Sequence, residues 1–130
     1  MEWKFNNEAP IYQQIMEQIK AMIATGVLKA GDKLPSVREL AVSAGVNPNT
    51  MQKALSELER DGLLCSKRTS GRFVSDNQEN ADILQEAMMM ECVKAFIENM
   101  AKLGYSVKDC IRIIEKYEKD TKDTSEEQKA

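Results

Sequence analysis

Two consecutive strings, Leu34-Pro35-Ser36-Val37-Arg38-Glu39-Leu40-Ala41 and Gly45-Val46-Asn47-Pro48-Asn49-Thr50-Met51, decide the fold of this 130-residue chain. Ser36 stands three residues before Glu39, the spacing of a capping box, in which the hydroxyl and the carboxylate each satisfy a free N–H at a helix start. Gly45 ends this helix, and Pro48 then begins another with Asn47 as its N-cap. Two short helices joined by a tight turn containing glycine are typical of a helix-turn-helix.

Apolar residues recur at helical spacing on both sides of this turn, so each segment has one face to bury. The two short helices carry Val37, Leu40, Ala41 and Ala44, then Met51, Ala54, Leu55 and Leu58 before Gly62. A third amphipathic helix precedes them, from Pro10, which suits a first turn because it lacks an N–H, to Gly26. Its apolar face comprises Ile11, Ile15, Met16, Ile19, Met22 and Ile23.

Two short β-prone runs follow the second helix of the motif. Residues 63–66 and 72–75 flank the polar loop Lys67-Arg68-Thr69-Ser70-Gly71, and this pattern predicts a β-hairpin. Gly71 permits a positive φ or a close backbone approach. A basic hairpin placed directly after a helix-turn-helix is a wing.

Beyond a boundary at Asp76-Asn77-Gln78, the pattern predicts a long helix from about 79 to 103 and a shorter one capped by Ser106. The fold class is therefore mostly α with a small β-hairpin. We expect a winged helix-turn-helix over 1–76, a helical dimerisation region over 77–118 and a polar, disordered tail over 119–130. The residues expected at the dimer interface are Leu84, Met88, Cys92, Phe96, Met100, Ile111 and Ile114.

Composition excludes several classes of protein. No apolar run approaches the roughly 20 residues of a membrane span, and the N-terminus does not resemble a signal peptide, so we expect a cytoplasmic protein. The three cysteines form no CxxC pair, which favours reduced, space-filling thiols. Histidine is absent, which removes the usual general base and the commonest metal ligand. We predict no enzyme activity, no metal and no cofactor.

The net charge of −3 conceals a basic region. Residues 33–72 hold 7 Lys and Arg against 4 Asp and Glu, a balance of 7 − 4 = +3. Residues 78–130 hold 8 against 12, a balance of 8 − 12 = −4. Affinity for phosphate depends on the local face, so the basic region is compatible with DNA binding.

The start of the second helix of the motif offers the chemistry of base recognition. Asn and Gln side chains can pair with adenine and Lys with guanine or phosphate, while the apolar residues turn inward. Arg38 lies in a first turn, where the helix dipole disfavours a cation, so a nearby phosphate would explain it. The expected DNA-binding residues are Ser36, Arg38, Asn47, Asn49, Thr50, Gln52, Lys53, Lys67, Arg68, Ser70, Gly71 and Arg72.

Each of these assignments has a structural alternative. Asn47 can serve only as a cap, and Gln52 and Lys53 can be ordinary solvated surface. Arg38 can pair with Glu39 or another carboxylate, and the basic hairpin tip can be merely solvated. The run Met88-Met89-Met90 fits a core or dimer seam, although methionine surfaces also suit adaptable ligand sites.

These residues together resemble the GntR family of bacterial regulators over about 9–75. The opening Pro10-Ile11-Tyr12-Gln13-Gln14-Ile15 and the phrase Asn47-Pro48-Asn49-Thr50 resemble its YtrA subgroup. The resemblance implies a homodimer that reads an inverted-repeat operator. It places Arg38, Asn49, Thr50 and Gln52, with the wing near Gly71, at DNA-contacting positions. Some branches have Arg where this chain has Pro48 and Gln52, so no operator sequence is predicted.

The leading hypothesis is a dimeric repressor that binds double-stranded operator DNA. About 50 residues after the wing can bury a stripe against a second copy but hardly enclose a standard ligand pocket, so a small-molecule effector stays possible and unassigned. One alternative is a winged-helix module that binds proteins, which would favour an apolar or acidic recognition face. An effector-dependent activator is another. A cysteine-nucleophile enzyme is disfavoured by the absence of histidine.

Overall fold

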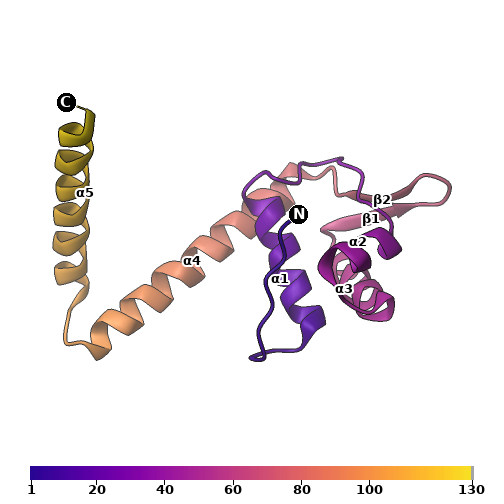
Figure 1. Ribbon diagram of the computed structural model, residues 1–130, viewed down its shortest axis with the longest axis horizontal. Helices are drawn as coiled ribbons and strands as arrows, with labels where there is room; N and C mark the ends of the chain where they lie inside the picture. Colours follow the sequence, from indigo (N-terminus) through magenta and orange to yellow (C-terminus); the bar gives the residue numbers. More distant parts are fainter. Residues whose placement is uncertain (130) are drawn as a thin grey trace. The chain divides into compact units, whose positions relative to one another are not determined.

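The computed structural model describes the backbone of residues 1–129 and the side chains of residues 1–124. The chain forms two compact units, Met1–Met88 and Met89–Ala130. The first unit contains the helices α1 (Ile11–Ala24), α2 (Val37–Ala44) and α3 (Pro48–Arg60) and the strands β1 (Leu64–Lys67) and β2 (Gly71–Val74) (Figure 1). Helix α4 (Gln78–Lys102) begins in the first unit and ends in the second, and α5 (Val107–Lys129) follows it. The expected mostly helical fold with one β-hairpin is confirmed.

The helix-turn-helix is held at its ends by the residues that the sequence indicates. The Ser36 Oγ accepts a hydrogen bond of 3.1 Å from the Glu39 N–H, and the Asn47 Oδ1 accepts one of 2.8 Å from the Asn49 N–H. Gly45 adopts the left-handed conformation at φ 69°, which glycine takes without steric cost. Only half of the expected capping box forms, because the Glu39 carboxylate makes no hydrogen bond within the described part of the chain.

A single apolar core lies between the three helices and the hairpin. Ile15 and Ile19 of α1 pack with Leu40 of α2 and with the buried face of α3. The largest fully buried side chains are Ile15, Ile19, Leu40, Met51, Leu55 and Leu58. The inward faces expected for all three helices are therefore the faces that the fold buries.

The loop before α2 pairs with strand β2 of the hairpin. This pairing joins the wing to the helix-turn-helix. The Leu34 N–H donates to the Arg72 carbonyl at 2.9 Å, and the Val74 N–H donates to the Asp32 carbonyl at 2.8 Å. Lys33 forms a β-bridge with Phe73. This pairing covers the outer edge of β2, whose own partner β1 runs antiparallel from Leu64 opposite Val74 to Lys67 opposite Gly71.

The N-terminal segment over residues 1–7 is tied to α1 by two glutamines. The side-chain amides of Gln14 and Gln18 each accept from the N–H and donate to the C=O of one residue in the segment, at 2.8–3.0 Å. The indole N–H of Trp3 donates to the Ser43 Oγ at 3.1 Å, and the Trp3 ring packs on the core. The apolar spacing of the sequence gives no indication that this segment is structured.

The first unit extends into α4. Ala81 and Leu84 pack against its core, so the compact body reaches Met88, beyond the boundary expected at residue 76. Leu84, expected at a dimer interface, is half-buried against that core.

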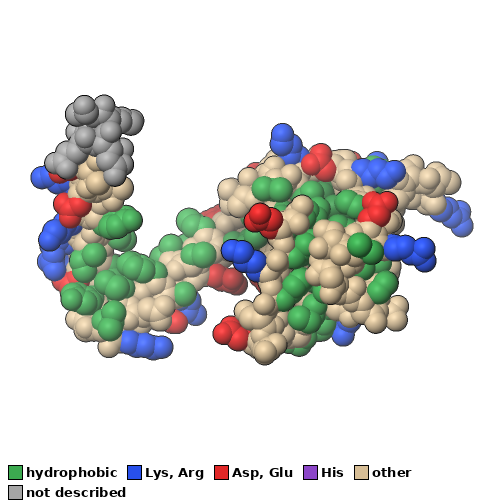
Figure 2. Space-filling view, in the orientation of Figure 1, with side chains coloured by type: hydrophobic (Ala, Val, Ile, Leu, Met, Phe, Trp, Pro, Cys, Tyr) green, Lys and Arg blue, Asp and Glu red, His purple; other side chains and the backbone are tan. Residues whose placement is uncertain are grey.

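The second unit leaves most of its apolar side chains exposed. Of its described side chains, Cys110 alone is buried, whereas Phe96 is 39%, Ile111 53% and Ile114 50% exposed. Figure 2 shows hydrophobic side chains gathered around the turn that joins α4 and α5. Two helices alone cannot enclose this much apolar surface.

Helix α5 continues to Lys129, through the residues expected to form a disordered tail. Glu and Lys have high helix propensity, and Lys122 forms an i,i+4 ion pair of 3.1 Å with Glu118, so the polar sequence supports a helix without burial. Ala130 lies outside the described residues. Among the helices described, none is both long and apolar enough to cross a membrane.

Replacing Ser36 with alanine is expected to lower the free energy of unfolding by about 0.5–2 kcal/mol, because the Glu39 N–H loses its cap. Urea denaturation of the full chain measures the change. Ser70→Ala is the matched control, since the Ser70 side chain is exposed and has no hydrogen bond in the part of the chain described. Equal stability of the two variants would contradict the capping role.

Candidate nucleic-acid interface

The start of α3 presents polar side chains to solvent. Met51, Ala54, Leu55 and Leu58 hold the inner face of the helix in the core. This places Asn47, Asn49, Gln52 and Lys53 on the exposed side and leaves Thr50 half-buried. The expected separation of an apolar inner face from an amide-rich outer face is therefore present.

Two of these side chains also make local hydrogen bonds. Asn47 caps α3 through its Oδ1, which leaves its amide NH₂ free to donate elsewhere. The Gln52 Nε2 donates to the Ser56 Oγ at 2.9 Å, one turn further along the helix. Both interactions use only part of each amide's hydrogen-bonding capacity, so a base edge or phosphate can still be contacted.

A groove of about 820 Å³ lies between the start of α2, Gln52 on the outer face of α3 and the hairpin. Four cations line it, Lys33, Lys67, Arg68 and Arg72, against the single carboxylate of Glu39. Ser36 lines it at the N-terminus of α2. Cations and a helix N-terminus both attract phosphate. The expected residues that it brings together are Ser36, Gln52, Lys67, Arg68, Ser70, Gly71 and Arg72. Lys33 was not among the expected residues, although it directly precedes the Leu34-Pro35-Ser36 string.

Arg38 lies in the first turn of α2 and is exposed. Among the described side chains it forms no ion pair within 4.0 Å, with Glu39 or any other carboxylate. The local ion pair considered as an alternative is therefore absent, and the guanidinium remains available to an anion.

Arg72 has a different environment from the other hairpin cations. Its side chain is only 14% exposed, and its Nη2 lies 3.5 Å from the Glu59 Oε2 of α3. Its buried Nε has no hydrogen-bond partner among the described residues. The Ser66 hydroxyl of β1 donates to the same carboxylate. Glu59 thus joins both strands to α3, β1 through Ser66 and β2 through Arg72. Less of the Arg72 charge is therefore available for phosphate than that of Lys67 and Arg68.

A second groove, of about 690 Å³, lies beside α1 and the N-terminal segment. The carboxylates of Glu2, Glu17 and Glu57 line it together with one cation, Lys4, so its lining is acidic and less suited to phosphate. Within the described residues there is also no cluster of three or more His, Cys, Asp or Glu side chains able to hold a metal ion. The groove beside the hairpin is therefore the better candidate for a nucleic-acid interface.

The Glu59 contacts predict a pH dependence of stability. The hydrogen bond from Ser66, assisted by the nearby Arg72 guanidinium, lowers the pKa of the Glu59 carboxyl below its ordinary value of 4.5. A pKa that is lowered on folding stabilises the native state above the unfolded pKa, and this stabilisation is lost as the pH falls through the folded pKa. We expect the stability difference between wild type and Glu59→Gln to be full at pH 6–7 and to shrink below pH 4.5.

Urea denaturation from pH 7 to pH 3 measures this difference. Ser66→Ala is the matched control, because it removes the largest cause of the lowered pKa and should reduce the pH dependence while the Glu59 carboxylate remains. A difference between wild type and Glu59→Gln that is constant over this range would contradict the assignment.

A helix-turn-helix with an amide-rich second helix, followed by a basic hairpin, defines a winged-helix, DNA-binding transcription regulator. The family described as "Bacterial regulatory proteins, gntR family" matches residues 11–74. The uncharacterised HTH-type transcriptional regulator YhcF of Bacillus subtilis is 37% identical over 117 residues, which cover 90% of this chain and 97% of that protein. This chain belongs to the GntR family, in its YtrA subgroup.

Two further comparisons agree with this assignment. The HTH-type transcriptional repressor YtrA of Bacillus subtilis is 49% identical over 71 residues, or 55% of either chain. The solved structure of a GntR family transcriptional regulator from Listeria monocytogenes superimposes with a TM-score of 0.80 at 37% identity, and covers 86% of this chain and 98% of that one. The resemblance inferred from the motif residues is confirmed.

Proposed function

We propose that this regulator is a homodimer that represses transcription by occupying an inverted-repeat operator. The observation that carries the proposal is that Gln52, from the exposed start of α3, lines the basic groove beside the hairpin. The helix would supply base contacts in the major groove, and the groove would hold the adjacent phosphate backbone. Repression is proposed because YtrA, which shares 49% identity over 71 residues, is named a repressor.

The proposed DNA surface keeps all the expected residues and divides them by role. The start of α3 would face base edges through Asn47, Asn49, Thr50, Gln52 and Lys53. The phosphate backbone would contact Arg38, the Ser36 hydroxyl and the hairpin residues Lys67, Arg68, Ser70 and Gly71. Arg72 would hold the hairpin in place, because its guanidinium already contacts Glu59.

Dimerisation is assigned to the second unit and the adjoining part of α4. The exposed apolar side chains there include Met89, Met90 and Val93 in addition to Phe96, Ile111 and Ile114. A second copy would bury this surface, and the same two helices would thereby hold two DNA-binding units together. Of the expected interface residues, Met88, Cys92, Phe96, Met100, Ile111 and Ile114 are retained, while Leu84 already packs on the first core.

A mobility-shift titration with the DNA immediately upstream of the protein's own gene tests the proposal. Salt is varied and non-specific competitor DNA is present, because phosphate contacts make affinity fall steeply with salt. We expect a specific complex that saturates at one dimer per inverted repeat. Binding no stronger than to random DNA, there and at sites recovered by genome-wide pull-down, would contradict operator recognition.

A further inference from the structure

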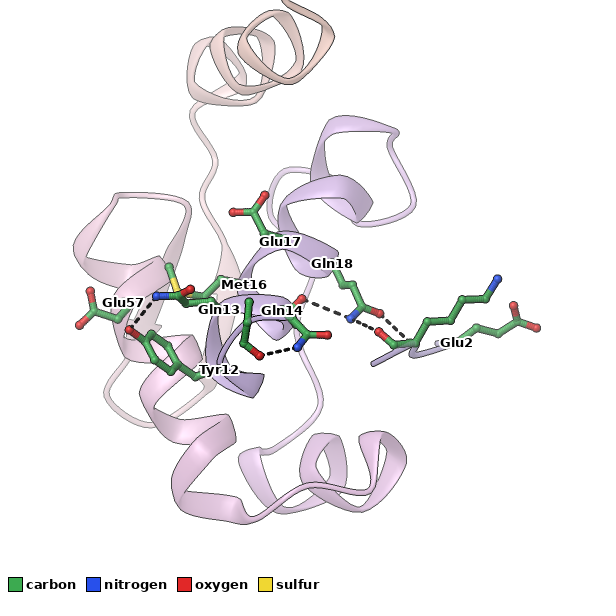
Figure 3. Close-up of a pocket in the computed structure, with 10 residues that line it drawn as sticks. Glu2, Tyr12, Gln13, Gln14, Met16, Glu17, Gln18 and Glu57 are labelled. Carbon is green, nitrogen blue, oxygen red and sulfur yellow. Dashed lines mark hydrogen bonds between the residues drawn. The ribbon is translucent and has the colours of Figure 1, made fainter. Parts of the chain in front are cut away.

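The ammonium of Lys53 lies against an aromatic ring from a different helix. Its Nζ is 3.9 Å from the centroid of the Tyr12 ring, which projects from the first turn of α1. The Tyr12 hydroxyl accepts a hydrogen bond of 3.2 Å from the Gln13 Nε2. Figure 3 shows this hydrogen bond and the position of Glu57 on α3, close to the Tyr12 side chain. Lys53 is thus placed by a contact outside its own helix.

Lys53 also has a carboxylate within reach along α3. Glu57 follows it by four residues, a spacing at which Lys and Glu side chains meet on the helix surface. The Glu57 Oε2 instead lies 3.4 Å from the Arg60 Nη1, and Lys53 forms no ion pair among the described side chains. The Tyr12 ring and the Glu57 carboxylate are therefore two alternative partners for the Lys53 ammonium. In the structure the ammonium contacts the ring.

The two positions differ in what they leave available to DNA. An aromatic face attracts a cation without neutralising it, whereas an ion pair with Glu57 would have to break before the lysine could bind phosphate. The lysine stem also has several rotatable bonds, and restricting them before binding lowers the entropy lost on binding. A lysine held over the ring is thus preorganised and remains a full positive charge.

We propose that Tyr12 is a positioning residue for DNA recognition, which holds the Lys53 ammonium over its ring, out of an ion pair with Glu57 and available to the DNA. The inference rests on the proposed contact of Lys53 with the operator and specifies how that contact is prepared. The Tyr12 ring carries this role, and its hydroxyl does not.

A double-mutant cycle with the full chain tests the proposal, using an operator duplex selected from a random-sequence library by the wild-type protein. Tyr12→Leu is expected to weaken binding about two- to fivefold, the range of a partly exposed cation–π contact, and Tyr12→Phe to leave it unchanged. Tyr12→Leu added to Lys53→Ala should cause no further loss, because the positioned group is already absent. Glu57→Gln should recover more affinity in the Tyr12→Leu background than in wild type.

Proton NMR of the free protein distinguishes a loss of Lys53 positioning from a loss of folding. The ε-methylene protons of Lys53 should resonate upfield under the ring current in wild type and in Tyr12→Phe, and return to ordinary positions in Tyr12→Leu. Thermal denaturation of each variant establishes that it is folded at the temperature of the binding assay.

The outcomes distinguish this inference from the function on which it rests. If Lys53→Ala leaves operator affinity unchanged, the proposed DNA contact of Lys53 is wrong, and the positioning role falls with it. If Lys53→Ala weakens binding but Tyr12→Leu causes the same loss with and without Lys53, the positioning role alone is overturned. A loss in Tyr12→Phe equal to that in Tyr12→Leu would assign the effect to the hydroxyl and also overturn it.

Discussion

Replacing Arg38 and Lys53 together with alanine is expected to weaken operator binding by roughly 2–6 kcal/mol, because removing a side chain that binds a base or phosphate costs about 1–3 kcal/mol. Both side chains are exposed, and neither forms an ion pair among the described residues. Alanine is a good helix former, so α2 and α3 should persist in the variant.

Fluorescence anisotropy at fixed salt measures the affinity, and a salt titration measures how many phosphates each variant neutralises. If Arg38 binds phosphate, the slope of log affinity against log salt should fall by about 1 when it is replaced. The matched control is Lys4→Ala with Lys29→Ala, which removes the same charge from two exposed residues that lie outside α2, α3 and the groove beside the hairpin. A double variant at Arg38 and Lys53 that binds as tightly as this control would refute the assigned surface.

Introducing a carboxylate into the exposed apolar face of the second unit is expected to dissociate the dimer. The Ile114 side chain is 50% exposed in the single chain, and a second copy would bury it. An unpaired charge in a buried interface costs about 3–5 kcal/mol, so Ile114→Glu should raise the dimer dissociation constant by about a hundredfold to several thousandfold. Operator affinity should fall as well, since each half-site would then bind independently.

Sedimentation equilibrium at micromolar concentration measures the dissociation constant. Val27→Glu serves as the control, because Val27 is also an exposed apolar residue, 68% accessible, but belongs to the first unit. If Ile114→Glu and Val27→Glu both leave the dimer intact, this face does not hold the two copies together.

Features set by local chemistry were predictable from the sequence. The ends of α2 and α3 follow from the hydroxyl of Ser36, the amide of Asn47 and the permissive backbone of Gly45. The buried faces of the helices follow from apolar spacing alone. The hairpin follows from two short β-prone runs around a polar loop. The short loop leaves few possible registers between β1 and β2. Each of these depends on residues that are close in the chain.

Features that depend on distant residues were not predictable. The pairing of Glu59 with Arg72 requires knowing which residues of the hairpin face α3, and this depends on how the loop before α2 pairs with β2. The contact of Tyr12 with Lys53 depends on the packing of α1 against α3. Leu84 belongs to the apolar stripe of α4 that was expected at a dimer interface. The same apolar spacing also allows α4 to pack on the core of the first unit, where Leu84 lies.

Hydroxyl-radical footprinting of the full-length protein on the DNA upstream of its gene tests the central claim most directly, because it locates the protected backbone nucleotide by nucleotide. Two recognition helices held by one dimer should protect two stretches related by twofold symmetry, with centres about 10–10.5 base pairs apart or a multiple of that distance. The Arg38→Ala, Lys53→Ala double variant should lose both protections together. A uniform pattern identical to that on random DNA, or protection that the double variant retains in full, would contradict the account.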